Sequence, residues 1–115
     1  MNNYIFYIYG KKDCGYFNNS INLLKSKNCN VITENSVDDM KKKIKLDLNI
    51  DMIKYNHNTS PMIFYGNKKK LLFIGGNDKI TYLINEINSN INEKIKNELN
   101  NKNDIISNFI LSCII

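Results

Sequence analysis

Residues 4–17 read YIFYIYGKKDCGYF, and this stretch decides the fold. Its first six residues are all β-branched or aromatic, which is typical of a buried strand, and apolar side chains at helical spacing begin after Cys14. The stretch therefore predicts a strand that leads into a helix, with Cys14 at the helix N-terminus. Unpaired backbone N–H groups and nearby lysines favour the thiolate at such a position. Cys14 is therefore a candidate nucleophile.

The rest of the chain continues the alternation of strands and helices. Ser36 is a predicted helix N-cap, and Pro61 should open a strand because it cannot donate a hydrogen bond inside a sheet. Gly66-Asn67 is the predicted turn of a β-hairpin. The elements predicted from these signals are strands at 29–33, 62–65 and 71–74, and helices at 37–48, with a continuation to 54 left open, and from 79 to beyond 89.

This order of elements predicts an α/β fold. One parallel crossover followed by a hairpin yields a four-stranded mixed sheet flanked by helices, and 115 residues suffice for one hydrophobic core. We expect a domain at 1–89 and a C-terminal helical extension or tail at 90–115. Within the tail, the apolar run 105–115 should fold back as a short helix.

The charge balance argues against a nucleic-acid-binding protein. The net charge is +5, but there is no arginine to bind guanine in a bidentate manner, and the lysines are scattered or in short runs. No zinc-finger or helix-turn-helix signature is present. We therefore expect no nucleic-acid partner, and we interpret the lysine runs 41–43 and 68–70 as solvated faces. For the second run, at the predicted hairpin tip, attraction of acidic partners is left open.

Cysteine usage and hydropathy favour a cytoplasmic protein. Cys14, Cys29 and Cys113 are odd in number and widely spaced, which fits neither a disulfide framework nor a zinc site and favours a reducing compartment. We expect Cys29 and Cys113 to serve packing, with an intermolecular disulfide of Cys113 as the alternative, and no residue to bind a metal. The apolar run 105–115 is much shorter than the roughly 20 residues of a transmembrane segment. The N-terminus lacks the features of a secretion signal.

Three motifs together resemble those of the glutaredoxins, a branch of the thioredoxin-like proteins, across roughly residues 4–89. Members of that family carry Tyr-Ser-Lys-x-x-Cys-x-x-Cys after the first strand, Thr-Val-Pro with a cis proline, and Gly-Gly-x-Asp before the last helix. The matching stretches here are YGKKDCGYF at 9–17, TSP at 59–61 and GGND at 75–78. The resemblance implies a thioredoxin-like, glutaredoxin-type fold and glutathione as co-substrate.

The resemblance also implies a reaction and a set of binding residues. Cys14 would attack the mixed disulfide of a glutathionylated protein, become glutathionylated itself, and be regenerated by free glutathione. The expected partners are therefore glutathione and glutathionylated or disulfide-bearing protein substrates. The implied glutathione-binding residues are Lys11, Tyr16, Ser60, Pro61, Gly75, Gly76, Asn77 and Asp78.

Each part of glutathione has an implied partner in this set. Lys11 would pair with the glycine carboxylate, and the backbone of Ser60 would bond the main chain of the ligand's cysteine. Asp78 and the backbone at Asn77 would hold the γ-glutamyl end at a helix start, where unpaired N–H groups suit a carboxylate. Tyr16 would line the groove beside the thiol.

Two departures from the family pattern leave alternatives open. Phe17 occupies the position of the second, resolving cysteine, so that only a monothiol cycle remains. A non-catalytic binding or assembly module on the same fold is the first alternative. A glutathione-ligated iron–sulfur cluster carrier is the second; it is not favoured, because the chain lacks the Cys-Gly-Phe-Ser sequence and the longer insertion of that branch. His57 and Asn58 stand where relatives often carry glutamine or arginine, and we interpret His57 as a solvated loop residue.

Overall fold

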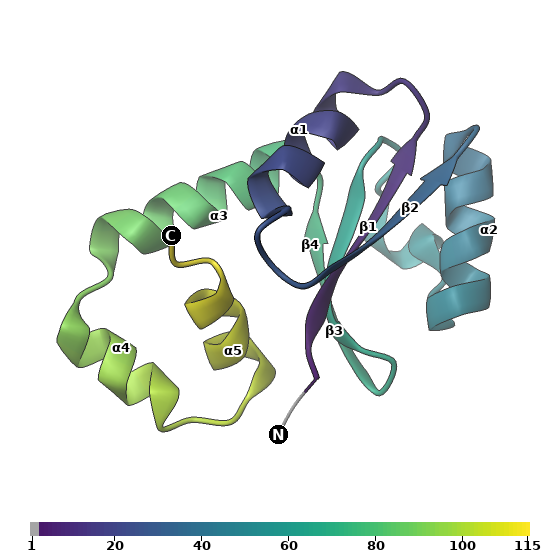
Figure 1. Ribbon diagram of the computed structural model, residues 1–115. Coiled ribbons are helices and arrows are strands. Elements are labelled where there is room, and N and C mark those ends of the chain that lie inside the picture. Colours follow the sequence, from purple (N-terminus) through teal and green to yellow (C-terminus); the bar gives the residue numbers. More distant parts are fainter. Residues whose placement is uncertain (1–2) are drawn as a thin grey trace.

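The four strands form one mixed sheet in the order β2-β1-β3-β4 (Figure 1). The computed structural model describes residues 3–115. In it, β1 (Ile5–Lys11) lies parallel to β2 (Cys29–Glu34) and antiparallel to β3 (Met62–Asn67), which pairs with the antiparallel β4 (Lys70–Gly75). The predicted four-stranded mixed sheet with flanking helices is thus confirmed, and each strand matches its prediction to within two residues.

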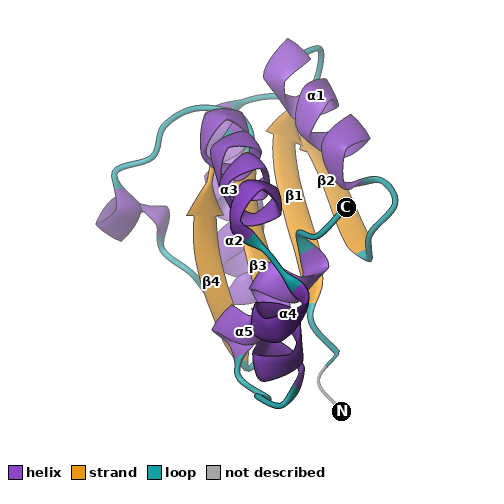
Figure 2. Cartoon of the chain, turned by 90° about the vertical axis from the view of Figure 1, so that its left-hand side faces the viewer, coloured by secondary structure: helices purple, strands orange, loops and turns teal. Residues whose placement is uncertain are grey.

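Side-chain alternation along β1 divides the core into two layers. Phe6 and Ile8 face one side of the sheet, where they pack with α1 (Gly15–Leu24), α3 (Asn77–Asn90) and α5 (Ile105–Ser112). Tyr7 and Tyr9 face the other side and pack with α2 (Val37–Leu48) and a short 3-10 helix, η1 (Met52–Tyr55). Figure 2 shows α3 and α5 in front of the sheet and α2 behind it.

The predicted cap of α2 is confirmed, but its continuation to 54 is wrong. The Ser36 hydroxyl accepts a hydrogen bond from Asp39 N at 3.1 Å. At the other end, Asn49 adopts the left-handed conformation with φ 57°, and its N–H bonds to Lys45 O. The α-helix therefore stops at Leu48, and the chain resumes helical form only in η1.

The predicted hairpin turn lies two residues too early in the sequence. Gly66 and Asn67 belong to β3, and Lys68 and Lys69 form the turn. Gly66 has φ +145°, and a Cβ there would lie 2.1 Å from Lys70 O, so only glycine fits this end of the strand. The Asn67 side chain closes the turn by accepting hydrogen bonds from the N–H groups of Lys69 and Lys70.

The helical pattern after residue 79 is two helices rather than one. α3 ends at Asn90, and α4 (Glu93–Asn100) begins behind an Asn92 cap whose side chain accepts from Ile95 N at 2.9 Å. A continuation of the first of these helices well past residue 89, which the apolar spacing allowed, is therefore wrong. The helix is interrupted because the backbone of Ile91 is extended. The helical spacing of apolar residues continues through Ile91, so it did not indicate this break.

The last apolar segment folds back as the predicted short helix, and it belongs to the core. Phe109 of α5 is 6% exposed and contacts the rings of Phe6 and Tyr65, with centroid distances of 6.0 and 5.4 Å. Asn88 of α3 holds the chain end by donating to Cys113 O and accepting from Ile115 N. None of the helices within residues 3–115 combines the length and the hydrophobicity needed to cross a bilayer.

Candidate functional site

Cys14 stands at the junction of β1 and α1. Asp13, with φ 63°, turns the chain out of the strand, and Cys14 is the extended N-cap residue of α1. Its N–H bonds to Lys11 O, and its carbonyl accepts the first helical hydrogen bond, from Asn18 N at 3.1 Å. The side chain is half-buried. The predicted location of Cys14 at a helix N-terminus is therefore confirmed.

The pKa of the Cys14 thiol lies below its ordinary value. Burial is the largest single influence and raises the pKa, but it is outweighed by the groups that stabilise the thiolate. These are, in decreasing order of effect, a hydrogen bond from Ser60, the backbone N–H groups of Phe17 and Tyr16, and the charge of Lys11. The thiolate is the nucleophilic form, so this environment raises the fraction of reactive sulfur at neutral pH.

Ser60 presents two groups to the Cys14 sulfur: a carbonyl oxygen, which favours the thiol, and a hydroxyl group, which favours the thiolate. The protonated thiol donates to the Ser60 carbonyl oxygen at 3.7 Å, an interaction that favours the neutral form. The Ser60 hydroxyl oxygen accepts from Lys11 N at 2.8 Å, which leaves its own proton for the thiolate. The Ser60–Pro61 peptide bond is cis, as the family resemblance implied, and Pro61 is buried. The end of β1, Cys14 and the loop before β3 are thereby joined.

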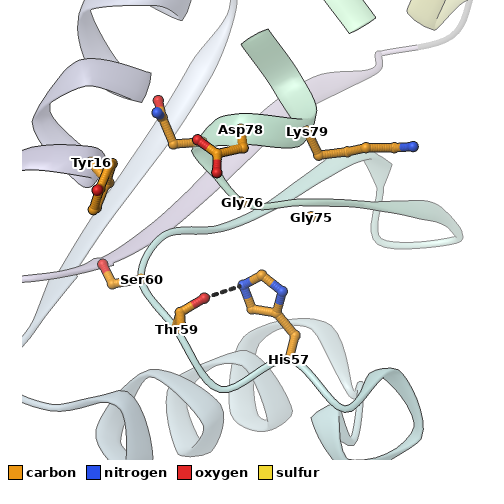
Figure 3. A pocket seen from close by; sticks show the side chains of 9 residues that line it. Tyr16, His57, Thr59, Ser60, Gly75, Gly76, Asp78 and Lys79 are labelled. Carbon is orange, nitrogen blue, oxygen red and sulfur yellow. Dashed lines mark hydrogen bonds between the residues drawn. The ribbon is translucent and has the colours of Figure 1, made fainter. Parts of the chain in front are cut away.

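A pocket of about 500 Å³ opens beside this junction (Figure 3). It lies between the start of α1, the loop before β3 and the start of α3. Figure 3 shows Tyr16 and Ser60 on one side, His57 and Thr59 below, and Asp78 above. Its lining residues are Tyr16, His57, Thr59, Ser60, Gly75, Gly76, Asn77, Asp78 and Lys79.

The pocket unites most of the residues predicted from the three motifs. Tyr16, Ser60 and the whole stretch 75–78 line it. Cys14 does not line the pocket itself but reaches it through its contact with Ser60. Lys11 and Pro61 do not line it either. Lys11 stands beside the thiol, and the Pro61 carbonyl lies within hydrogen-bonding distance of a lining residue, His57.

The start of α3 presents its backbone to the pocket. Gly76 is the N-cap, and its carbonyl accepts from Ile80 N, so the N–H groups of the first turn have no partner within the helix. The Asn77 side chain is committed elsewhere, because its oxygen accepts from Asn19 Nδ2 at 2.8 Å and from Ser20 Oγ at 2.9 Å. Asn77 therefore offers the pocket its backbone rather than its amide. The adjacent Asp78 contributes an exposed carboxylate.

His57 is a pocket residue that sequence reasoning missed. Its interpretation as a solvated loop residue is wrong, because the ring is half-buried. Nε2 lies 3.1 Å from Pro61 O and 3.3 Å from Thr59 Oγ1, and the ring meets Phe73 edge-on at a centroid distance of 5.3 Å. A Cβ on Gly76 would lie 3.3 Å from His57 Cε1, so glycine leaves room for this imidazole.

Thr59 and Lys79 are the other lining residues that were not predicted. Thr59 is the first residue of the TSP stretch at 59–61, and Lys79 directly follows the GGND stretch at 75–78; these positions were the signal that could have identified them. The same holds for His57, which stands two residues before Thr59. The ammonium group of Lys79 lies 5.9 Å from the centre of the Tyr82 ring, and Figure 3 shows the side chain running away from Ser60 along the rim.

The residue at the second motif position points into the core. Phe17 is 2% exposed, and its ring lies directly on Gly10: a Cβ there would be 2.0 Å from two ring carbons. Gly10 and Phe17 are therefore a complementary pair in which the absence of one side chain makes room for the other. The side of Cys14 where a resolving thiol would stand is filled by packed hydrocarbon.

The other two cysteines have packing roles, as predicted. Cys29 contacts the main core, and its thiol donates to Leu24 O at 2.9 Å. Cys113 is fully buried in the same core, and burial raises the pKa of its thiol to about 11. Burial also raises the pKa of Cys29. Both thiols are thus in environments that oppose ionisation, unlike Cys14.

Within residues 3–115, no three His, Cys, Asp or Glu side chains are grouped so that they could hold a metal ion. The chain matches no protein-family model, and a comparison with curated proteins finds no match either. The site itself offers one sulfur with a lowered pKa, a pocket that meets backbone N–H groups without a partner within α3, and an adjoining carboxylate and imidazole.

Proposed function

We propose that this chain is a glutathione-dependent thiol–disulfide oxidoreductase of the glutaredoxin type, built on a thioredoxin-like fold and acting through Cys14 alone. The observation that carries the proposal is the environment of the Cys14 sulfur. Its pKa is lowered, and it lies 3.7 Å from the carbonyl oxygen of Ser60, which lines the pocket and precedes the cis Pro61. A reactive sulfur beside a pocket of peptide size fits thiol exchange with a small peptide disulfide.

The reaction consists of two exchanges at sulfur. The Cys14 thiolate attacks the glutathionyl sulfur of a protein–glutathione mixed disulfide, so that a bond forms between the two sulfurs and the protein thiolate leaves and takes up a proton. A second glutathione, as thiolate, attacks the glutathionyl sulfur now bound to Cys14. Glutathione disulfide is released and the Cys14 thiolate is restored. Overall, the mixed disulfide is reduced to the protein thiol, and one free glutathione combines with the transferred glutathionyl group as glutathione disulfide.

The pocket supplies groups for the central peptide chain and the γ-glutamyl end of the tripeptide. The backbone of Ser60 would bond the peptide chain of glutathione, which sets the ligand sulfur close to Cys14. The first turn of α3 would receive the γ-glutamyl carboxylate on its free N–H groups, and Asp78 would bind the adjoining ammonium group. Tyr16 is 65% exposed, and it would cover the ligand from the side of α1.

A monothiol cycle follows from the packing of Phe17. The position at which a second thiol would displace glutathione from Cys14 is occupied by a phenylalanine ring that is buried against Gly10. Regeneration of the Cys14 thiolate from its mixed disulfide therefore depends on free glutathione. The mixed disulfide between Cys14 and glutathione is the expected intermediate.

Reduction of hydroxyethyl disulfide in the presence of glutathione tests this function. The wild type should accelerate the reaction, and Cys14→Ser should reduce the rate to that of glutathione alone. Cys29→Ser is the matched control, since it removes a half-buried thiol whose pKa is raised, and it should retain the activity. A mass spectrum after incubation with glutathione disulfide should place one adduct on Cys14. Equal rates for wild type and Cys14→Ser would refute the proposal.

A further inference from the structure

A second hollow lies on the opposite layer of the molecule, between α2 and η1. Its volume is about 380 Å³, and it is separate from the pocket beside Cys14. Its lining residues are Lys41, Lys42, Lys45, Asp51, Met52 and Ile53. We call this hollow the α2–η1 groove.

The groove combines a hydrophobic surface with positive charge. Met52 is buried at its base, whereas Ile53 is 80% exposed at its edge. Asp51 is the one acidic residue of the lining, and its carboxylate already accepts a hydrogen bond from Ile53 N at 3.0 Å. Leu46, four residues after Lys42 and therefore on the same side of α2, is 79% exposed. Two large aliphatic side chains thus face solvent next to the groove.

The lysines of this region are not an evenly solvated face. Lys43 pairs with Asp47 at 3.0 Å outside the groove, and Lys41 binds the side-chain oxygen of Asn58. The side chains of Lys42 and Lys45 have no hydrogen bond or ion pair with any residue in the part of the chain that the structure describes. These two ammonium groups are therefore available to an external partner.

The link between Lys41 and Asn58 relates the groove to the pocket. Asn58 immediately precedes Thr59, which lines the pocket, so the two hollows lie on either side of one loop. A partner that occupied the groove would stand beside the entrance to the candidate active site.

We propose that the α2–η1 groove docks an acidic segment of a partner protein. The carboxylates of the segment contact Lys42 and Lys45, and one of its aliphatic side chains packs against Met52 and Ile53. The hydrophobic part of the lining favours a peptide over a nucleic acid, because phosphate and sugar would leave it uncovered. The proposal goes beyond the thiol chemistry, since it does not require Cys14 to react.

Fluorescence anisotropy with a labelled peptide tests the docking. The probe is a fluorescein-labelled 12-residue peptide of glutamates with two adjacent leucines at its centre, and the protein is Cys14→Ser, so that thiol exchange cannot contribute. The charge reversal Lys42→Glu/Lys45→Glu should weaken binding by about tenfold or more, because two attractions become repulsions. Ile53→Ser should weaken it without any change of charge.

The control variant is Lys68→Glu/Lys69→Glu, which makes the same change of net charge at the exposed tip of the β3–β4 hairpin. It should bind the peptide nearly as tightly as the parent. An equal loss in the two charge-reversed variants, no loss with Ile53→Ser, or no binding of the peptide at all would overturn the proposal. So would tighter binding of an oligothymidylate or of phosphatidylserine vesicles. None of these outcomes bears on hydroxyethyl disulfide reduction, so the two proposals fail independently.

Discussion

Cys14 and Cys113 carry the same side chain in opposite environments. Cys14 is half-buried at the start of α1, where hydrogen-bond donors and a lysine lower its pKa despite the opposing effect of burial. Cys113 is fully buried after the end of α5, where burial raises its pKa to about 11. The pKa of a thiol in this protein is therefore set by the groups that surround it and not by the residue type alone.

The largest expected difference between the two thiols is their rate of alkylation. With iodoacetamide at pH 7, Cys14 should react at least about 100-fold faster than Cys113, because the latter reacts only after the chain opens locally or globally. Peptide mass mapping over time measures both rates in one sample, and addition of denaturant should make them similar. If Cys14 needed denaturant, or titrated near the unperturbed 8.5, the non-catalytic module would be the better account of the site.

The pH dependence of stability should show the same contrast with opposite signs. A raised folded-state pKa stabilises the native state below the unfolded value and loses that contribution as pH rises, so Cys113 should destabilise the protein between pH 9 and about 11. A shift from 9.0 to about 11 corresponds to about 2–3 kcal/mol of unfolding free energy at the upper limit. Cys14, with its lowered pKa, should make stability rise with pH up to its ordinary value.

Urea denaturation at several pH values measures these slopes. Cys113→Ala should remove the decrease that belongs to Cys113, and Cys14→Ala should remove the increase at lower pH. An unchanged alkaline slope in Cys113→Ala would assign the decrease to the buried tyrosines Tyr9 and Tyr65, whose pKa values burial also raises.

Substitution of His57 tests the contribution of the pocket lining, as distinct from that of the Cys14 sulfur. His57→Ala removes a ring that lines the pocket and its polar contacts with Pro61 and Thr59, so the KM for glutathione should rise by about fivefold while kcat at saturation changes little. Asn58→Ala, at the neighbouring loop position outside the pocket lining, is the control. A fall in kcat at constant KM would place His57 in the reaction of the sulfur rather than in ligand binding.

Of these substitutions, Lys11→Ala should have the smallest effect, and it should act on the pKa of Cys14 and on glutathione binding. The charge of Lys11 is the weakest of the influences that lower the pKa of Cys14, so Lys11→Ala should raise that pKa only slightly. The change, and any weakening of glutathione binding, should be larger at low salt than at 1 M salt because Lys11 is exposed. Lys12→Ala tests whether these effects are specific to Lys11 or are shared by the neighbouring lysine. A loss of binding that is independent of salt would contradict an electrostatic role.

The candidate site was predictable where its signal is local. Strand periodicity followed by helical spacing placed Cys14 at a helix start, and the stretches at 59–61 and 75–78 indicated the other two walls of the pocket. His57 was missed because a histidine in an Asn-rich loop looks like any solvated residue. Its role arises only when β4 brings Phe73 and Gly76 against it.

The same limit explains the errors in the fold. Asparagine is a good N-cap and also tolerates the left-handed conformation, so a chain rich in asparagine offers many equivalent points at which a helix could start or stop. Asn49 ends α2 and Asn92 starts α4, whereas Asn88 lies inside α3 and holds the chain end. Packing selects among these positions, and no local pattern distinguishes them.

By itself, the amino-acid sequence determined the four strands and that Cys14 begins a helix, because these depend on side-chain periodicity within a few residues. The tertiary structure alone decided that Phe17 fills the space above Gly10, that Ser60 meets the sulfur of Cys14, and that α5 completes the core. Each of these contacts joins residues whose preferences are satisfied only when the sheet brings distant parts of the chain together.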